Sequence, residues 1–418
     1  MNIGFVGLGK LGFPCAVAME KIGGHSLKGF DINPAVKQIL NARKAPYEEI
    51  LFEEFLSDSN IELVDNVGEL VDWAEIIFIA VQTPHEKMYE GISPVPDKKI
   101  DFDYRILTSA VESLSEALSK NEKVNPLIVV ISTVLPGTMN QHVLPKLKSV
   151  REQLRFCYNP YFIAMGSTIK DFLDPEFVLI GSLQKEDANF LENFYSTIHN
   201  APAKKMEIES AELTKVAYNT FIGFKIVFAN ALAEITESRG GNVDDVTDAL
   251  ALATSRLMSG KYLRAGMSDG GGCHPRDQIA MSWLAEEIGL SADIFGWLAN
   301  ARDLQTKNQA KLISEYAQKN HLPICLLGWA YKANTSLEIG SPAKLLAWYL
   351  KDFGLPFNVY DPFSLPDQKL PENASVFFVS TNHDVFYDLE LPSGSVVIDP
   401  WGLKEKWGNS VNVIKPGR

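Results

Sequence analysis

The sequence predicts an α/β protein in which two Rossmann-like, doubly wound parallel-sheet domains are joined by a long central helix and a helical middle domain. An apolar strand at residues 2–7 leads directly into a glycine-rich turn and a helix. A proline-free helical pattern covers residues 210–240, and strand and helix patterns alternate again from about residue 322. Such alternation is typical of parallel sheets. We therefore expect domains at residues 1–195, 196–315 and 316–418.

Length and composition agree with a globular protein of two or three domains. The 418 residues are 46% apolar and 22% charged, and the net charge of -13 argues against a broad nucleic-acid surface. Four widely spaced cysteines without a CxxC pair indicate neither a disulfide framework nor a zinc site, and they fit a reducing compartment. No apolar run reaches bilayer length and no cationic leader precedes the first strand. We expect a cytoplasmic protein with no metal, membrane or nucleic-acid partner.

The turn after the first strand has the dinucleotide-binding fingerprint. Gly7, Gly9 and Gly12 are followed by a helix and by a second strand that ends at Asp31. The glycines allow the backbone to approach a pyrophosphate at the helix N-terminus. Asp31 would accept the ribose hydroxyls and repel a 2′-phosphate, which favours NAD over NADP. The cofactor-binding residues predicted in this turn are Gly7, Leu8, Gly9, Lys10, Leu11 and Gly12.

Two further strands, at 74–81 and 126–132, each end in a polar loop. Ligands of open α/β sheets bind at the carboxyl ends of the strands, although threonines in such loops can also serve only to cap a turn. The polar, proline-rich residues 85–103 predict a surface loop. Six loop residues are predicted to contact the cofactor: Val81, Gln82, Thr83, Pro84, Ser132 and Thr133.

The long helix carries the first candidate catalytic pair. Lys215 and Asn219 are four residues apart and therefore share one helix face. Burying an ammonium and an amide near the start of a largely apolar helix costs free energy. These groups therefore indicate a hydrogen-bond partner or a functional role, unless this first turn is exposed to solvent. A helix of this length is longer than a small domain is wide, so it predicts a spine between two domains or two subunits.

A second candidate site lies in the glycine-rich stretch 269–277. Cys273 follows three glycines and precedes a helix, where backbone N–H groups and the helix dipole stabilise a thiolate. The alternative is a small buried cysteine. Asp277 follows one turn later. His274 is expected to be a bystander, because adjacent side chains point away from each other.

The C-terminal part predicts a second, smaller Rossmann-like unit. Strand patterns at 323–327, 357–362, 375–381 and 395–399 surround a helical pattern at 341–354. This part lacks a GxGxxG turn, so a mononucleotide fits better than a dinucleotide.

Taken together, the motifs resemble the nucleotide-sugar dehydrogenases of the UDP-glucose/GDP-mannose 6-dehydrogenase family over nearly the whole chain. Besides the fingerprint with Asp31, the matching segments in family order are VQTP at 81–84, STVLPGT at 132–138, NPYFIAMGSTIKDFLDPEFVLIG at 159–181, SAELTKVAYNTF at 210–221, GGGCHPRD at 270–277, LGWAYKANT at 327–335 and SPAKLL at 341–346.

The resemblance implies oxidation of a sugar C6 alcohol to a carboxylate with two NAD per product. Lys215 and Asn219 would hold the C6 oxygen, and Asp277 would position a water or hydroxyl. Cys273 would form a thiohemiacetal and then a thioester, which water hydrolyses. Thr133 would serve the nicotinamide end and water placement.

The resemblance further implies a nucleotide-sugar substrate, with a UDP-sugar similar to UDP-glucose preferred, and a role in polysaccharide biosynthesis. Arg256 would reach the neighbouring subunit's site, which implies a homodimer. The substrate-binding residues that it implies are Tyr161, Phe162, Ile163, Lys215, Asn219, Arg256, Tyr262, Leu263, Arg264, Gly270, Tyr331 and Lys332.

The chain departs from the family pattern at several positions. Tyr161 and Met165 stand where the family has acidic residues, residues 339–340 are Ile-Gly rather than Arg-Glu, and DPWG at 399–402 replaces a DGRN-like segment. The glutamate missing at Tyr161 is the family's candidate base for thioester hydrolysis, and His274 or a water held by Thr133 could replace it. Two alternatives remain: a single-step alcohol dehydrogenase of the β-hydroxyacid type, and a non-catalytic protein that binds NAD or a nucleotide sugar.

Overall fold

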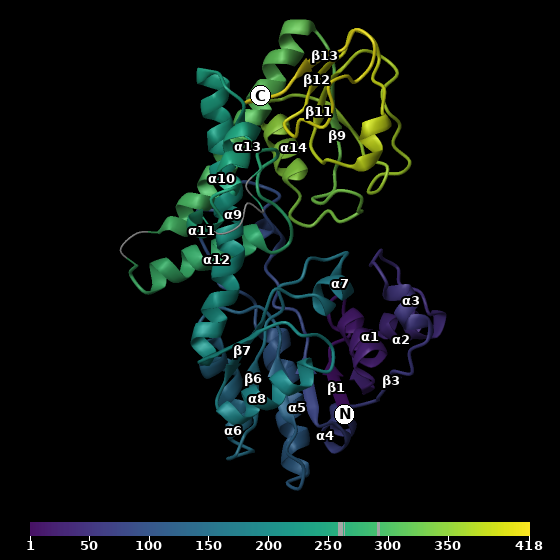
Figure 1. Cartoon of the computed structure of the whole chain (residues 1–418), viewed down its shortest axis with the longest axis vertical. Coiled ribbons are helices and arrows are strands. Elements are labelled where there is room, and N and C mark those ends of the chain that lie inside the picture. The colour runs from purple at the N-terminus through teal and green to yellow at the C-terminus, as the bar shows by residue number, and fades with distance from the viewer. Residues whose placement is uncertain (258–261, 263, 291–292) are drawn as a thin grey trace. The chain divides into compact units, whose positions relative to one another are not determined.

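The computed structural model describes residues 1–257, 262, 264–290 and 293–418 (Figure 1). The side chains of residues 231, 234, 235, 238, 239, 255 and 256 also lie outside the described part. The chain forms two compact units: Met1–Pro84 with Phe102–Ala217, and His85–Asp101 with Tyr218–Arg418. The division predicted at residues 195 and 315 stays a prediction.

The first unit is built on an eight-stranded sheet. All neighbouring strands are parallel except β6 and β7, which are antiparallel. The strand order is β3 (Glu62–Leu63), β2 (Ser26–Phe30), β1 (Asn2–Val6), β4 (Ile76–Ile79), β5 (Leu127–Val130), β6 (Phe156–Tyr158), β7 (Val178–Ser182) and β8 (Ala203–Met206).

The central strands of this sheet are buried on both faces, which explains their continuous apolar runs. β8 was not expected, because two of its four residues are lysines; it forms an edge of the sheet, where side chains remain exposed. The helices of this unit are α1 (Gly12–Gly23), α2 (Pro34–Ala42), α3 (Phe52–Ser57), α4 (Val67–Trp73), α5 (Arg105–Lys120), a π-helical turn (Met139–Val143), α6 (Leu144–Lys148), α7 (Thr168–Leu173) and α8 (Lys185–Tyr195).

The predicted long helix is confirmed as α9 (Ile208–Arg239), the longest helix in the described part of the chain. It ends at two glycines with positive φ angles of 81° and 111°, a backbone region that glycine enters without strain. The boundary between the two units falls within α9, after Ala217.

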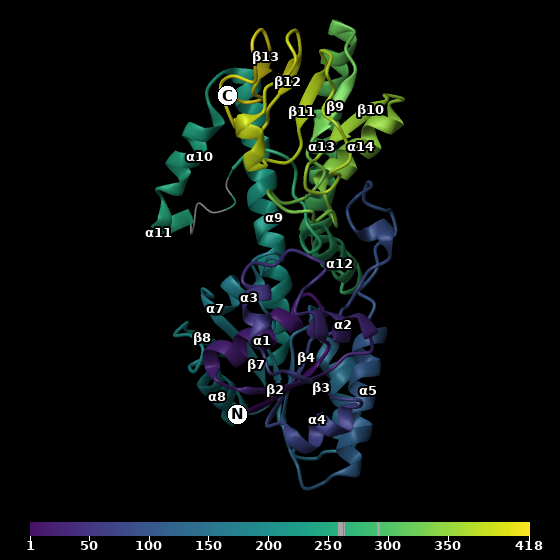
Figure 2. The ribbon, with the colours of Figure 1, turned by 90° about the vertical axis from the view of Figure 1, so that its right-hand side faces the viewer.

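The second unit contains a five-stranded, all-parallel sheet. Its strand order is β10 (Phe357–Tyr360), β9 (Ile324–Leu327), β11 (Val376–Val379), β12 (Val396–Ile398) and β13 (Asn412–Ile414). Alternate residues of β9 and β11 enter two different cores. One core is shared with α13 (Ile294–Asn320) and α14 (Pro342–Asp352), which lie alongside each other next to this sheet (Figure 2). The predicted second Rossmann-like sheet is thereby confirmed.

The remaining helices of the second unit are α10 (Val243–Ala251), α11 (Thr254–Leu257), α12 (His274–Glu287) and two short 3-10 helices, Lys87–Tyr89 and Asp384–Asp388. Residues 85–101 cluster with this unit rather than forming the expected free surface loop. Tyr89 is buried, and the Gly91 carbonyl accepts a hydrogen bond from the buried Arg302 of α13.

Candidate active site

The turn between β1 and α1 is shaped for close approach of a ligand. Gly7 has a φ of 98°, and a Cβ on Gly12 would lie 2.4 Å from the Gly7 carbonyl oxygen, so neither position tolerates a side chain. A Cβ on Gly9 would meet nothing within 4 Å, so the backbone there borders open space. α1 starts at Gly12 with no acidic residue in its first turn, so the positive end of the helix dipole is available to an anion.

Asp31 lies directly beside this turn. Its carboxylate accepts hydrogen bonds from the Leu8 and Asn33 backbone N–H groups, both at 2.7 Å. An ionised carboxylate has about four acceptor sites, so capacity for the hydroxyls of a ribose is left.

The loops after β4 and β5 are tied to each other. The buried Thr83 hydroxyl donates to the Thr133 carbonyl at 2.6 Å, and the Ser132 hydroxyl donates to the Val81 carbonyl at 2.6 Å. The structure therefore brings four of the six predicted loop residues together at the carboxyl edge of the sheet. The Thr83 hydroxyl is the donor in one of these two hydrogen bonds between the loops.

Tyr161 presents its backbone, rather than its hydroxyl, to a candidate catalytic group. Its carbonyl accepts a hydrogen bond from the Lys215 ammonium at 2.7 Å, and the same ammonium lies 4.9 Å from the centre of the Phe162 ring. The Tyr161 hydroxyl is 3.0 Å from the Tyr195 hydroxyl, which in turn donates to Asn159. Burial raises the pKa of Tyr161 well above its ordinary value, so the phenol does not replace an acidic base.

Glu212 is a residue of the first unit that sequence reasoning missed. Its buried carboxylate accepts the Gly137 and Met139 backbone N–H groups at 2.6 and 2.8 Å, which ties the start of the π-helical turn to α9 one turn before Lys215. Burial raises its pKa to about 7 against the opposing effect of these two hydrogen bonds. An acidic residue three positions before Lys215 in an apolar helix was the available signal.

In the second unit, Asn219 and Asp277 are in direct contact. The Asn219 amide donates to one Asp277 oxygen at 2.7 Å, and Arg276 donates through Nε to the other at 3.0 Å. Asn219 and Asp277 are both buried. Both residues were predicted from the sequence as candidate catalytic residues, but their direct contact was not predicted.

Cys273 is the N-cap residue of α12, with its backbone carbonyl accepting the Asp277 N–H at 2.8 Å. It is exposed, whereas Cys15, Cys157 and Cys325 are buried. The alternative of a small buried cysteine is therefore wrong for Cys273. A thiolate at this position lies at the positive end of a 14-residue helix.

A second network, next to Cys273, was not predicted. The imidazole Nδ1 of His274 lies 2.8 Å from one oxygen of Asp269, and Gln278 donates to the other at 2.7 Å. Asp269 is fully buried. The contact spans five residues through a turn, so helix periodicity did not indicate it.

The glycine stretch packs against the LGWAYKANT and Ser-Pro segments of the second unit. The Gly271 N–H donates to the Gly340 carbonyl at 3.0 Å, and a Cβ on Gly271 would lie 3.0 Å from the Tyr331 ring. Gly340 has a φ of 67°, and a Cβ there would lie 2.1 Å from the Gly271 carbonyl oxygen. Glycine in place of the family's glutamate at position 340 therefore permits this close backbone contact.

The loop that carries Tyr331 and Lys332 is anchored by buried Asp361. One Asp361 oxygen accepts the Trp329 and Ala330 N–H groups at 2.5 and 3.0 Å and lies 3.1 Å from Nε2 of His383. Burial would raise the pKa of Asp361, but these hydrogen bonds outweigh it and hold the pKa well below its ordinary value. Neither Asp361 nor His383 was predicted.

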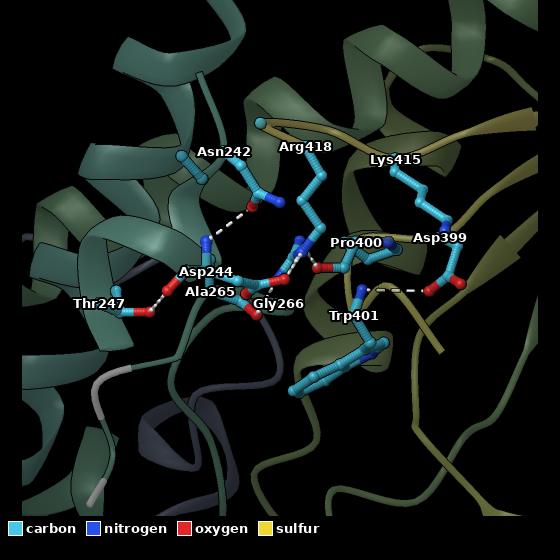
Figure 3. Close-up of polar contacts among 12 residues, drawn as sticks. Asn242, Asp244, Thr247, Ala265, Gly266, Asp399, Pro400, Trp401, Lys415 and Arg418 are labelled. Carbon is cyan, nitrogen blue, oxygen red and sulfur yellow. Dashed lines mark hydrogen bonds and ion pairs between the residues drawn. The ribbon is translucent and has the colours of Figure 1, made fainter. Parts of the chain in front are cut away.

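The DPWG segment at residues 399–402 is held by hydrogen bonds and packs against residues that are distant in the sequence. Asp399 accepts the Trp401 N–H at 3.1 Å (Figure 3), and the Trp401 ring packs against Gly266, where a Cβ would lie 2.4 Å from it. The Arg418 guanidinium forms a two-point contact with Asp244 of α10, at 2.6 and 2.9 Å, and also donates to the Pro400 carbonyl at 2.8 Å (Figure 3).

The other predicted substrate residues differ in their exposure. Tyr262 has a positive φ of 66° and is partly exposed. Arg264 is exposed, while Ile163, Gly270 and Lys332 are partly buried. Leu263 and the side chain of Arg256 lie outside the described residues. Among the described helices, none is both long and apolar enough to cross a membrane, and the described residues contain no cluster suited to a metal ion.

The glycine turn, the open start of α1 and the adjacent Asp31 define a dinucleotide-binding protein of the Rossmann class. Residues 1–199 match the NAD binding domain of the UDP-glucose/GDP-mannose dehydrogenase family, and residues 209–302 match its central domain. The chain belongs to this family, and it is an NAD-dependent oxidoreductase that acts on a CH–OH group of a nucleotide sugar.

Individual relatives are similar over most of their length. A UDP-glucose 6-dehydrogenase of Rickettsia conorii is 28% identical, with 99% of this chain and 93% of the relative covered. A GDP-mannose 6-dehydrogenase of Pseudomonas savastanoi pv. phaseolicola is 27% identical over 86% of this chain and 81% of the relative. The solved structure of a UDP-glucose dehydrogenase from Pyrobaculum islandicum has a TM-score of 0.86 and 25% identity, and it covers 100% of this chain and 97% of that chain.

Proposed function

We propose that this protein oxidises the C6 alcohol of a UDP-sugar similar to UDP-glucose to a uronate in two oxidation steps, through a thioester on Cys273. The observation that carries the proposal is an exposed cysteine at the N-terminus of α12, with a buried carboxylate on the next turn that is held by an amide from α9. Cys273 at the start of a helix could act as a nucleophile, and the hydrogen-bonded pair of Asn219 and Asp277 lies one turn away. This arrangement is suited to covalent catalysis at a carbonyl carbon.

NAD suits the first unit because the glycine turn leaves open space at Gly9 and because Asp31 is fixed beside it. Leu8, Asp31 and the tied loops after β4 and β5 would hold the cofactor, and NAD when bound accepts the hydrides that leave C6. The chain's own residues perform the remaining steps.

Lys215 and Asn219 are proposed to hold the C6 oxygen and to stabilise the negative charge that develops on it. Cys273 then attacks the aldehyde carbon to give a thiohemiacetal, which is oxidised to a thioester. Asp277, which Asn219 and Arg276 fix in place, orients the C6 hydroxyl or a water. Water finally cleaves the thioester.

The nucleotide part is assigned to the second unit. Lys332 and Arg264 are proposed to bind the diphosphate, and Tyr331 lies against the glycine stretch that precedes Cys273. UDP is preferred because several similar relatives act on UDP-glucose by name.

A homodimer is part of the proposal. Phe221, Phe224 and Phe228 form a stacked row on α9 with ring centres 6.3 Å apart, and each side chain is 42–45% exposed. A second copy of α9 would cover this row, and Arg256 would then contribute to the partner's site.

The test is the ratio of NADH formed to sugar consumed, measured with NAD and a panel of nucleotide sugars and combined with the product mass. Two NADH per sugar, with a net gain of one oxygen and loss of two hydrogens, is the expected result. One NADH and an aldehyde would instead support a single-step alcohol dehydrogenase, and NAD binding without any NADH would support a non-catalytic protein.

A further inference from the structure

The network of Asp269, His274 and Gln278 surrounds a fully buried carboxylate with an imidazole and an amide. One Asp269 oxygen contacts the His274 ring and the other accepts the Gln278 amide. Burying a carboxylate costs free energy of folding. We therefore expect the buried Asp269 side chain to have a role beyond stabilising the fold.

Three elements are shaped around this carboxylate. A Cβ on Gly223 of α9 would lie 2.6 Å from the Asp269 side-chain oxygen and 2.2 Å from the Gln278 amide nitrogen, so a larger residue there would displace both. The Asp269 carbonyl is fixed by Arg302 of α13 at 2.6 Å. His274 and Gln278 are both on α12, one turn apart.

The Asp269 carboxylate also determines which nitrogen of the neutral His274 imidazole carries the proton. A neutral histidine whose Nδ1 faces a carboxylate carries its proton on Nδ1 and its lone pair on Nε2. His274 directly follows Cys273, and its side chain is 19% exposed, so solvent reaches it.

The other acid–base groups near the chemistry are already engaged. Both Asp277 oxygens already accept hydrogen bonds, one from the Asn219 amide and the other from Arg276. The Tyr161 hydroxyl is bonded to Tyr195, and burial raises its pKa.

We propose that His274 is the general base that hydrolyses the Cys273 thioester and that Asp269 is the positioning residue that orients its imidazole. The proposal rests on the proposed function. Of the two replacements considered for the missing family glutamate, it selects His274 over a water held by Thr133. It sets aside the expectation that His274 is a bystander, because that expectation considered only the divergence of neighbouring side chains.

The proposed step is balanced. Nε2 of His274 takes a proton from a water while the water oxygen bonds to the thioester carbon. The C–S bond then breaks, the uronate carboxylic acid leaves, and the imidazolium proton returns to the Cys273 sulfur. No oxidant or further reactant is required.

The test compares the unaltered protein with H274Q, whose amide can still donate to Asp269. Each protein is mixed with NAD and UDP-glucose, NADH is followed before and during steady state, and the intact mass of the chain is measured. We expect H274Q to keep a burst of two NADH per active chain, to turn over about 100-fold more slowly or less in steady state, and to accumulate a uronyl adduct on Cys273. Hydroxylamine, which cleaves thioesters without a general base, should restore its turnover.

A second variant and a control separate this role from a structural one. D269N should show the same burst and the same adduct with a smaller loss, about 10-fold or more, because the imidazole loses its orientation. A merely structural change would instead reduce the burst itself. H321N, at an exposed left-handed position after α13, should turn over like the unaltered protein.

Two outcomes would overturn the assignment while leaving the proposed function intact. One is steady-state turnover of H274Q within twofold of the unaltered protein without an adduct. The other is loss of the burst in H274Q, which would place His274 before the thioester. If the unaltered protein forms no NADH, the proposed function fails and the assignment of His274 falls with it.

Discussion

At the scale of single residues, the four cysteines differ in burial: Cys15, Cys157 and Cys325 are buried, and Cys273 is exposed. Burial raises the pKa of Cys325 to about 12 and that of Cys15 well above its ordinary value, so these thiols stay protonated and inert. Cys273 is exposed at the start of α12. The proposed nucleophile therefore differs from the other cysteines by its position in the fold rather than by residue type.

Replacing Cys273 with serine tests the covalent route. Without a thiol no thioester forms, so we expect two-step turnover to fall by about a thousand-fold or more, while NAD affinity stays unchanged. The measurements are steady-state NADH formation and an NAD titration. Full turnover of C273S would exclude the thioester and favour a single oxidation.

Glu212 predicts a pH dependence of stability. Burial raises its pKa from 4.5 to about 7, so the folded protein holds a proton that the unfolded chain releases between these values. The contribution of this group is complete below pH 4.5 and is lost as the pH rises to about 7. Glutamine does not titrate, so the stability of E212Q relative to the unaltered protein should increase over this range by up to about 3 kcal/mol.

Denaturant unfolding of both proteins at several pH values measures this effect. E207Q changes an exposed glutamate just before α9 that does not contribute to the pKa of Glu212, so it is the control and should show a much smaller change with pH. A constant difference in stability between E212Q and the unaltered protein would show that folding does not raise the pKa of Glu212.

At the scale of elements, the loops after β4 and β5 act as one piece because side-chain hydroxyls bond across them. Replacing Thr83 with the isosteric valine removes the donor to the partly buried Thr133 carbonyl. We expect a loss of about 1–2 kcal/mol in the free energy of unfolding and weaker NAD binding, because the Thr133 loop is then less constrained.

T108V is the matched control for this substitution. The Thr108 hydroxyl donates to the Tyr104 and Arg105 carbonyls at the start of α5, which are local contacts, so its loss should change stability by less than about 0.5 kcal/mol. Equal stabilities of T83V and T108V would show that the loops are held together by other contacts.

The sequence predicted the elements whose pattern is local and missed those that depend on distant partners. The apolar runs of β1, β4 and β5, the glycine fingerprint and the long α9 were predicted within a few residues. β8 and β3 were missed because one is polar and the other has only two residues, so neighbouring strands define them. In the same way, Asp269, Glu212 and Asp361 were missed because their hydrogen-bond partners are far away or around a turn, where no periodicity applies.

At the scale of the whole molecule, the aromatic row of α9 leaves three large apolar side chains exposed side by side. Single exposed aromatic residues are common, but three stacked rings on one helix face are typical of a covered surface. The placement of Phe221, Phe224 and Phe228 therefore supports assembly as a homodimer.

Replacing Phe224 with lysine should convert the proposed dimer to a monomer, because a charge would be buried at the centre of the row. Light scattering coupled to size exclusion measures the mass. W348K changes an exposed aromatic residue of α14 and should leave the mass unchanged. A dimeric F224K, or a monomeric unaltered protein, would contradict the role given to α9.

The assignment of residues 85–101 to the second unit has a consequence for recombination between relatives. The polypeptide leaves the first unit at residue 84, returns at 102 and leaves again at 217, so neither unit is a contiguous stretch of gene. A chimaera joined only within α9 would combine Tyr89 and Gly91 of one parent with α13 of the other. The hydrogen bond from Arg302 of α13 to the Gly91 carbonyl would then join residues from two different parents. Exchanges that carry segments 85–101 and 218–418 together should preserve folding, whereas single-crossover exchanges should yield aggregating protein.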